Sequence, residues 1–494
     1  MGISPRQDER VGLVVLAAGA GTRMHSRIPK PLHPVAGIPM VARVLRAGDG
    51  ARPDARVLVL GPQSTDLASH LESWDGVATV VQDPPRGTGD AVKCALRALP
   101  DVDRLVVLYS DHPLLEQATV AKLHAGLRAS AARVAILTAV LDDAAGYGRI
   151  VRDADRRPVG IAERRDDDAE MRIGPTEINT GLMALDAHWA RQALEQIRPS
   201  GATGELYLTD LVSIAVAEAR DEEPWPVTVV AGGPDDALGV NERADLARAE
   251  SRSWERKRQR LMRDGVTMRL PETIVIDEDV RVGADTVILP YSHLSGATVV
   301  GSACVIGPSA VIVGSRLGDR VIVRSSTVED SEIADDADVG PYSHVRAGSE
   351  IGPRAHVGNF AELKNAHLNA GVKVGHFSYI GDAAVGDETN IGAGTVTANF
   401  DGAQKHRTDI GARAFIGSDT ILRAPISIGD DARTGAGSVV TKDVPAGATV
   451  VGVPARLVAS GRARKITAAG EVGKSASEDR PLTDLPTSRL TGSE

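Results

Sequence analysis

The segment LAAGAGTRM at residues 16–24 holds the first residues whose types and spacing suit chemistry. It follows the aliphatic run VGLVVLAAG (11–19), and its glycines let the backbone approach a ligand with consecutive free N–H groups that bind phosphate oxygens. Arg23 and Lys30 lie close by in the sequence, and their charges suit a triphosphate. A glycine-rich turn after a strand also arises for purely structural reasons, so these residues alone support a phosphate site and a tight turn about equally.

A second set of polar residues lies far downstream and consists of Arg346, Lys364, His376, Tyr379 and Asn390. The set contains an imidazole, two cations and a phenol, within about three coils of a repeat of roughly 18 residues a coil. An imidazole beside cations suits general-base chemistry, because a histidine can take a proton from an attacking nucleophile at neutral pH. A single histidine in such a repeat is more simply explained as a solvent-exposed residue on the outside of the fold. Only its occurrence together with the other four residues favours a catalytic role.

The elements that carry this second set repeat every six residues. Aliphatic residues recur in one phase at Ile276, Val282, Ile288, Leu294, Val300, Ile306 and Ile312, and again over 333–363 and 410–440 with Thr434 as a polar member. A period of six is typical of the hexapeptide parallel β-helix, in which three hexads make one triangular coil and the stacked aliphatics fill its interior. The 3% share of aromatic residues suits such a narrow interior. The interruption ANFDGAQKHRTD (398–409) is polar and is predicted to be a loop outside the coil.

The first part of the chain has another pattern. Short aliphatic runs at 11–19, 55–61, 104–110 and 132–140 alternate with helix-like stretches at 89–99 and 118–130, which predicts a doubly wound, Rossmann-like α/β domain over 1–240. Residues 241–265 are rich in helix formers and predict a linker helix. The β-helix domain is expected over 266–460. Residues 461–494 are polar and lack periodicity, so that tail is expected to be disordered.

The composition of the chain limits the classes of binding partner and the cellular compartment that we expect. The chain has 494 residues and a formal net charge of -10, which argues against sequence-independent binding of nucleic acid or an anionic membrane. Cys94 and Cys304 have no metal-binding spacing, so neither a zinc site nor a disulfide framework is expected. No apolar run reaches the length of a membrane span. We expect a cytoplasmic protein.

The segment LAAGAGTRM with Pro29 and Lys30 resembles the signature of sugar-1-phosphate nucleotidylyltransferases. With the hexapeptide repeat behind it, the chain over about 11–450 resembles the bacterial bifunctional N-acetylglucosamine-1-phosphate uridylyltransferase/glucosamine-1-phosphate N-acetyltransferase family. The resemblance implies a left-handed β-helix, acetyl transfer from acetyl-CoA to glucosamine 1-phosphate, then UMP transfer from UTP to N-acetylglucosamine 1-phosphate with Mg²⁺. The product would be UDP-N-acetylglucosamine for cell-wall precursors. A homotrimer with acyl sites between neighbours is also implied.

The resemblance further implies residue roles in the first domain. The nucleotide and sugar would be bound by Leu16, Ala17, Ala18, Gly19, Lys30, Gln82, Gly87, Thr88, Tyr109, Ser110, Asp111, Gly148, Glu163, Asn179 and Asn241. Arg23 and Lys30 would act on the phosphates, while Asp111 and Asn241 would bind Mg²⁺, which prefers oxygen ligands. No covalent nucleophile is required, because the sugar phosphate's own oxygen attacks the α-phosphorus of UTP and the protein positions the reactants.

In the second domain the resemblance implies that His376 is the general base. Arg346 and Lys364 would hold the sugar's 1-phosphate, and Tyr379 and Asn390 would position the sugar. Acetyl-CoA would be contacted by Ala393, Asn399, Phe400, Ser418, Ala436 and Val453, with Ser418 near the developing oxyanion.

Four residues depart from the family pattern: Ser110 replaces Gly, Asp90 replaces His, Phe400 replaces Tyr and Val453 replaces Arg. They leave open a glucose-1-phosphate nucleotidylyltransferase of other base or sugar specificity with a weak acyl site. A non-catalytic regulatory subunit of the same architecture is a further alternative. It predicts the loss of Lys30, Asp111 or the GTG loop, and the sequence retains all three.

Overall fold

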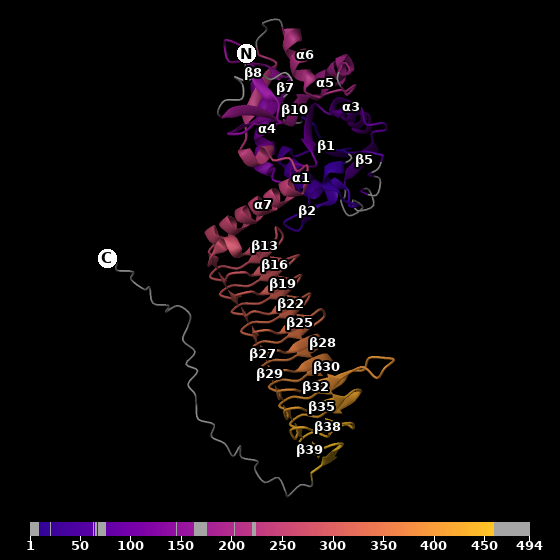
Figure 1. Cartoon of the computed structure of the whole chain (residues 1–494), viewed down its shortest axis with the longest axis vertical. Coiled ribbons are helices and arrows are strands. Elements are labelled where there is room, and N and C mark those ends of the chain that lie inside the picture. Colours follow the sequence, from indigo (N-terminus) through magenta and orange to yellow (C-terminus); the bar gives the residue numbers. More distant parts are fainter. Residues whose placement is uncertain are drawn as a thin grey trace, which may run out of the picture. The chain divides into compact units, whose positions relative to one another are not determined.

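The computed structural model describes residues 9–458 except 20, 63, 65–66, 68–75, 145, 163–174, 202 and 220–223. Glu163 and the tail at 461–494 therefore lie outside the described residues. The chain divides into two compact units, Met1–Ala347 and Gly348–Glu494, so the division falls within the repeat. The first unit contains an α/β domain, a long helix and the first coils of the repeat, and the second contains the remaining coils (Figure 1).

The α/β domain is built on a twisted sheet with strand order β11-β7-β10-β6-β1-β4-β5. Its strands are β1 (Val11–Ala17), β4 (Ala55–Leu60), β5 (Val77–Val81), β6 (Arg104–Tyr109), β7 (Val134–Leu141), β10 (Thr176–Asp186) and β11 (Val227–Ala231). The pairs β1–β4, β1–β6, β4–β5 and β7–β11 are parallel, and β10 runs antiparallel to β6 and β7. A hairpin of β8 (Arg149–Arg152) and β9 (Pro158–Ala162) pairs with β10. The predicted α/β fold of the first domain is confirmed, with β10 running against the other strands of the main path.

Helices cover both faces of this sheet, which explains why its strands are continuous aliphatic runs. Along β1, Val14 and Leu16 pack into one core with α3 (Thr88–Ala98), α5 (Ala187–Ala193) and α6 (Asp210–Ala219). Leu13 and Val15 point to the opposite core with α1 (Met40–Gly48) and α4 (Gln117–Ser130). Two further elements, β2 (Pro34–Val35) and β3 (Ile38–Pro39), form a small antiparallel ribbon.

The long helix α7 (Arg243–Arg263) lies within the predicted 241–265. The Asp245 carboxylate accepts hydrogen bonds from the backbone N–H groups of Asn241 and Glu242 at 2.8 and 3.1 Å, which caps the helix start. Burial raises the pKa of Asp245, but these hydrogen bonds and Arg248 outweigh burial and lower the pKa below its ordinary value. At the other end, Arg258 donates to the Ile274 carbonyl oxygen at 2.8 Å and fastens α7 to the first coil.

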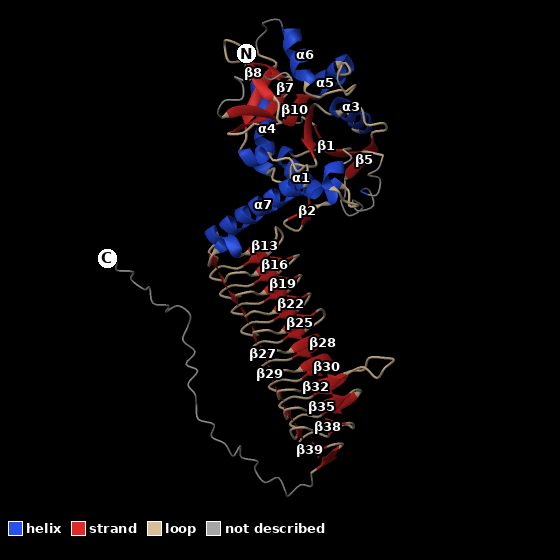
Figure 2. Cartoon of the chain, in the orientation of Figure 1, coloured by secondary structure: helices blue, strands red, loops and turns tan. Residues whose placement is uncertain are grey.

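The coils of the first unit consist of short parallel strands, each paired with a strand about 18 residues further on (Figure 2). They are β12 (Thr267–Met268), β13 (Val275–Ile276), β14 (Arg281–Val282), β15 (Val287–Ile288), β16 (His293–Ser295), β17 (Val299–Val300), β18 (Val305–Ile306), β19 (Val311–Val313), β20 (Arg316–Leu317), β21 (Ile322–Val323), β22 (Thr327–Glu329), β23 (Glu332–Ile333), β24 (Asp338–Val339) and β25 (His344–Arg346). The aliphatic of each hexad is buried except Val282, which is half-buried. Val282 and Ile276 both belong to the first coil, but α7 packs against β13, which carries Ile276.

The second unit continues the same architecture. Its strands are β26 (Glu350–Ile351), β27 (His356–Asn359), β28 (Glu362–Leu368), β29 (Lys373–His376), β30 (Tyr379–Val385), β31 (Asn390–Ile391), β32 (Val396–Ala398), β33 (Thr408–Ile410), β34 (Phe415–Ile416), β35 (Ile421–Arg423), β36 (Ile426–Ile428), β37 (Arg433–Thr434), β38 (Val439–Val440), β39 (Thr449–Gly452) and β40 (Ala455–Leu457). The predicted loop lies between β32 and β33 and projects from the coils (Figure 1). The parallel β-helix is thus confirmed.

Buried hydroxyl groups join successive rungs inside the coils. Thr286 donates to the Gly301 carbonyl oxygen at 2.8 Å and accepts from the Cys304 N–H at 3.1 Å. Thr434, the polar member of the third series, accepts from the Gly417 N–H at 2.9 Å. A hydroxyl inside the prism is tolerated because it is hydrogen-bonded. Among the described helices, none has both the length and the apolar character of a membrane span.

Candidate functional site

A cavity of about 290 Å³ opens at the carboxyl ends of β1 and β6, where α/β sheets place ligands. Predicted nucleotide-binding residues that line it are Leu16, Ala17, Ala18, Gly19, Lys30, Gln82, Gly87, Thr88, Tyr109, Ser110 and Asp111. Residues far apart in the sequence, such as Gly19, Gly87 and Asp111, therefore meet in one place. The structure thus supplies a single pocket with a glycine-rich wall and a charged end.

The charged end is lined by Lys30 and Asp111, and Asn241 and Arg23 adjoin it from outside the lining. The Lys30 Nζ lies 2.6 Å from Asp111 Oδ2 and 3.3 Å from Asn241 Oδ1, and the Arg23 Nη2 lies 2.9 Å from the same Asn241 oxygen. The Lys30 and Asp111 side chains are only 13% and 23% exposed, so their charges are partly shielded from water. Gly21 allows this arrangement, because it adopts a φ of +60° and a Cβ there would lie 2.6 Å from Lys30 Cβ.

Asp111 and Asn241 offer the oxygen donors that a hard divalent cation prefers. Both oxygens already lie beside one ammonium group, which shows that this end of the cavity accommodates positive charge. The segment before α7 is tied to the Asp111 loop because Val240 N–H donates to the Asp111 carbonyl oxygen at 2.8 Å. Within the described ranges, no cluster of three or more His, Cys, Asp or Glu side chains suits a metal ion. Two protein oxygens completed by phosphate oxygens and water fit Mg²⁺.

The opposite end of the cavity is formed by Gln82 and the GTG loop. The Gln82 Nε2 donates to the Gly87 carbonyl oxygen at 3.0 Å and to Asp90 Oδ2 at 2.8 Å. Both donor hydrogens of the amide are thereby used, and Oε1 is the acceptor atom of this lining residue. The Thr88 hydroxyl accepts from the Leu208 N–H at 2.9 Å and so also fastens the loop to a neighbouring segment.

Not every predicted residue of the first domain lines this cavity. Asn179 and Gly148 lie together, since the Asn179 N–H donates to the Gly148 carbonyl oxygen at 2.8 Å, and neither is among the lining residues. Sequence reasoning missed Glu205 and Tyr207, which do line it. Their only signal is an acidic and an aromatic residue in the short polar segment before α6.

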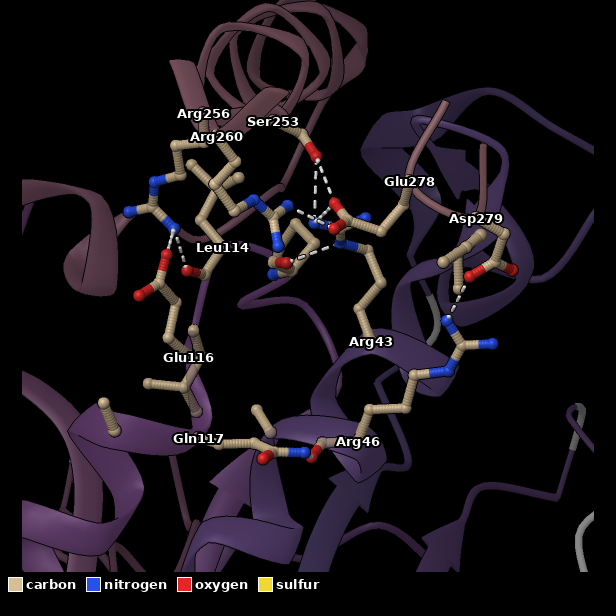
Figure 3. Close-up of a pocket in the computed structure, with 15 residues that line it drawn as sticks. Arg43, Arg46, Leu114, Glu116, Gln117, Ser253, Arg256, Arg260, Glu278 and Asp279 are labelled. Atoms are coloured by element: carbon tan, nitrogen blue, oxygen red, sulfur yellow. Dashed lines mark hydrogen bonds and ion pairs between the residues drawn. The ribbon is translucent and has the colours of Figure 1, made fainter. Parts of the chain in front are cut away.

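A second cavity of about 480 Å³ is lined in part by Leu114, Glu116 and Gln117, which follow Asp111 in the chain (Figure 3). Arg43 crosses it and donates to the Pro113 carbonyl oxygen at 2.8 Å, to Ser253 Oγ of α7 at 2.9 Å and to Glu278 Oε2 of the first coil at 3.2 Å. Arg256 of α7 donates to the Leu114 carbonyl oxygen at 2.6 Å. Burial raises the pKa of Glu278, but the facing arginines outweigh it and lower that pKa. The arginines at this cavity are ion-paired, and they hold the loop that carries Asp111.

In the second unit, the predicted base and several predicted acetyl-CoA contacts form one column along a corner of the coils. Gly394 N–H donates to the His376 carbonyl oxygen at 3.1 Å, which places Ala393 one rung beyond His376. Asp419 N–H donates to the Ala393 carbonyl oxygen at 2.6 Å, and Gly437 N–H donates to that of Ser418 at 2.7 Å. The column His376, Ala393, Ser418, Ala436 therefore rises through successive rungs, and the imidazole is exposed rather than inside the prism.

Beside this column, Tyr379 and Asn399 share a polar cluster with Asp382. Asn399 Nδ2 donates to Asp382 Oδ2 at 2.5 Å and lies 3.5 Å from the Tyr379 hydroxyl. Burial raises the pKa of Asp382, but hydrogen bonds from Asn365 and Asn399, with the nearby charges of Lys405 and Lys364, lower it overall. Sequence reasoning missed Asp382, whose position in an ordinary hexad gives no signal.

Other predicted residues of the acyl site lie apart from this cluster or in the other unit. Asn390 begins β31, with Lys373 as its strand partner. Phe400 is 61% exposed in the projecting loop, and Val453 is exposed after β39. Arg346 ends β25 in the first unit, and its role as a phosphate ligand stays a prediction.

Comparisons with known proteins identify both kinds of domain. Residues 13–162 match the MobA-like NTP transferase domain, and residues 407–442 match the hexapeptide repeat of succinyl-transferase. The chain is 40% identical over 452 residues to the "Bifunctional protein GlmU" of Prochlorococcus marinus (strain MIT 9313), an alignment that covers 91% of this chain and 99% of the relative. The protein of the same name from Corynebacterium efficiens is 39% identical, with 90% and 92% covered, and that from Heliobacterium modesticaldum is 42% identical, with 89% and 94% covered.

Proposed function

The chain belongs to the family of bifunctional GlmU proteins, and from that premise we propose how its residues carry out two reactions. It is a bifunctional enzyme of UDP-N-acetylglucosamine synthesis, with a uridylyltransferase domain and an acetyltransferase domain. The observation that carries the residue assignment is the convergence of the glycine-rich wall, Lys30 and Asp111 on one cavity.

In the first domain, the phosphates of UTP lie against the backbone of Leu16–Gly19. Lys30 and Arg23 offset the charge that develops as the sugar phosphate oxygen attacks the α-phosphorus and pyrophosphate leaves. Gln82 accepts a hydrogen bond from the base through Oε1, the atom its contacts with Gly87 and Asp90 leave available. When bound by Asp111, Asn241 and phosphate oxygens, Mg²⁺ supplies further charge neutralisation.

In the second domain, His376 takes the proton of the amine of glucosamine 1-phosphate. The thioester of acetyl-CoA lies along the column from Ala393 to Ala436, with the Ser418 hydroxyl toward the developing oxyanion. Tyr379 and Asn399 position the sugar and the acyl donor, and Lys364 binds the 1-phosphate. Three features support this assignment: the exposed imidazole, its place in that column, and the adjoining polar cluster around Asp382.

Separate nucleotide and acyl assays test the assignment. The protein is incubated with glucosamine 1-phosphate, acetyl-CoA, Mg²⁺ and one nucleoside triphosphate at a time, and products are resolved by mass. We expect UDP-N-acetylglucosamine with UTP only, and another nucleotide sugar would contradict the assigned specificity. His376→Ala should abolish acetyl transfer and spare uridylyl transfer from supplied N-acetylglucosamine 1-phosphate. Equal loss of both activities would contradict two separate sites.

Assembly and location complete the proposal. Hexapeptide repeats favour self-association, and copies of the chain assemble into a homotrimer, as the family resemblance implies. The enzyme works in the cytoplasm, where UTP and acetyl-CoA are available. Sedimentation of the full chain measures the assembly, and a monomer at assay concentrations would contradict it.

A further inference from the structure

Asn359 occupies the position directly below His376 on the preceding rung. Strands β27 and β29 pair in parallel with Asn359 opposite His376. The Phe377 N–H donates to the Asn359 carbonyl oxygen at 3.2 Å, just as the Gly394 N–H donates to the His376 carbonyl oxygen one rung further on. Asn359 is therefore a member of the same column as the predicted base and the predicted acetyl-CoA contacts.

The Asn359 side chain contacts the imidazole itself. Its Oδ1 is hydrogen-bonded to Nδ1 of His376. An amide oxygen only accepts hydrogen bonds, so Nδ1 is the ring nitrogen that carries the proton in the neutral imidazole. The lone pair is then on Nε2, which is the nitrogen able to remove a proton from a substrate.

Neighbouring residues hold both side chains at this corner. Phe360 and Phe377 directly follow Asn359 and His376, and their rings stack with centroids 5.0 Å apart and planes 10° from parallel. Both phenylalanines adopt left-handed backbone conformations, with φ of 57° and 49°. The two rungs therefore bend in the same way, which keeps the amide and the imidazole in register.

We propose that Asn359 is a positioning residue for acetyl transfer, which fixes the tautomer of His376 and keeps its Nε2 available as the base. The proposal rests on the proposed function of His376. In the reaction, Nε2 takes a proton from the amine as the amine nitrogen forms a bond to the thioester carbonyl carbon. The C–S bond then breaks, and the proton on Nε2 passes to the departing CoA sulfur. Throughout, the Nδ1–H remains hydrogen-bonded to Asn359.

The test compares Asn359→Leu with Asn359→Asp in the full-length enzyme, with acetyl-CoA and glucosamine 1-phosphate as substrates. Leucine cannot accept the Nδ1–H, so kcat for acetyl transfer should fall about 10–100-fold with KM values little changed, as expected for loss of a group that orients a histidine. Aspartate still accepts the Nδ1–H but stabilises the imidazolium. The acid limb of its pH–rate profile should therefore move to higher pH by about one unit.

The strands that carry and flank this pair present the following groups. His356 on β27 and Lys373 on β29 lie three positions back along their strands, β31 presents Asn390 and Ile391, and Tyr379 begins the strand that follows His376. None of these residues is changed in the variants. A shift of the acid limb of the pH–rate profile in Asn359→Asp therefore reports the effect of the new carboxylate.

Asn369→Leu provides the matched control, because Asn369 is an exposed asparagine of the same unit outside the acyl site, and it should retain wild-type kcat and pH profile. A wild-type kcat in Asn359→Leu, or an unmoved limb in Asn359→Asp, overturns the proposal. If Asn359→Leu does not fold, the pH–rate profile of Asn359→Asp alone tests the proposal. His376→Ala separates the two levels of inference. If His376→Ala retains acetyl transfer, the assignment of His376 as the base is wrong. If His376→Ala loses acetyl transfer while both Asn359 variants behave like the wild type, only the positioning role of Asn359 is wrong.

Discussion

Replacing Lys30 with methionine removes the cation from the nucleotide cavity while keeping a side chain of similar length. The Lys30 side chain is 13% exposed, and its ammonium contacts both Asp111 and Asn241. Loss of one pre-organised charge at a shielded reacting centre costs about 2.7–4 kcal/mol of transition-state stabilisation, or about 10²–10³ in rate. We expect a decrease of that size in kcat/KM for UMP transfer. Unfolding stability should fall by only about 1 kcal/mol, because Asp111 is left partly solvated.

Pyrophosphate release with UTP and N-acetylglucosamine 1-phosphate measures this loss, and thiol release from acetyl-CoA in the same preparation serves as an internal reference. Lys93→Met is the matched control. Lys93 is 15% exposed on α3 and forms an ion pair with Glu195 at 3.2 Å, but it does not line the cavity. The reasoning is refuted if Lys30→Met and Lys93→Met lower uridylyl transfer equally, or if Lys30→Met lowers acetyl transfer as much as uridylyl transfer.

Two further changes test the elements that hold this site. Gly21→Ala places a Cβ against Lys30 and strains a left-handed residue by about 1–2 kcal/mol, so thermal unfolding should occur earlier and pyrophosphate release should slow, with acetyl transfer unchanged. Asp245→Ala removes the cap of α7 at a cost of about 1 kcal/mol and frees Asn241, so half-maximal uridylyl transfer should need more Mg²⁺. Because the folded pKa of Asp245 is lowered, its stabilisation is present above the unfolded pKa of about 3.9 and is lost as pH falls through the folded value. The Tm difference between wild type and Asp245→Ala should therefore shrink in acid, and a constant difference would contradict the capping role.

The β-helix was predictable from sequence because its period is a direct property of the coil. Ile288 and Ile306 pair on successive coils and are eighteen positions apart, because each coil repeats the same three faces of six residues. The α/β sheet was predictable for a similar reason, because strands covered on both faces are aliphatic throughout. The partial exposure of Val282 could not be predicted, because a sequence period does not indicate which coil lies at an end of the stack.

The residues of the two sites were harder to predict from sequence patterns than the fold was. Lys30 and Asn241 are 211 positions apart, and their meeting depends on the whole sheet and the start of α7. The family resemblance, rather than spacing, assigned each of these two residues to the nucleotide site, and their contact was not predicted. Asp382 and Asn359 were missed because each occupies an ordinary outward position in its hexad, and its importance comes from the side chain one rung away.

Since hydroxyl groups make the same kind of contact between successive rungs, the number of coils sets the length of the β-helix, as in a molecular ruler. Because Thr286 hydrogen-bonds to groups of the next rung, each rung depends only on its immediate neighbours. Insertion or deletion of a whole coil would change the ruler's length by about 4.8 Å and leave every remaining interface intact. A single added hexad would instead turn all later residues onto another face of the prism. Evolution can therefore lengthen or shorten this part of the enzyme in discrete steps without rebuilding the chemistry it carries.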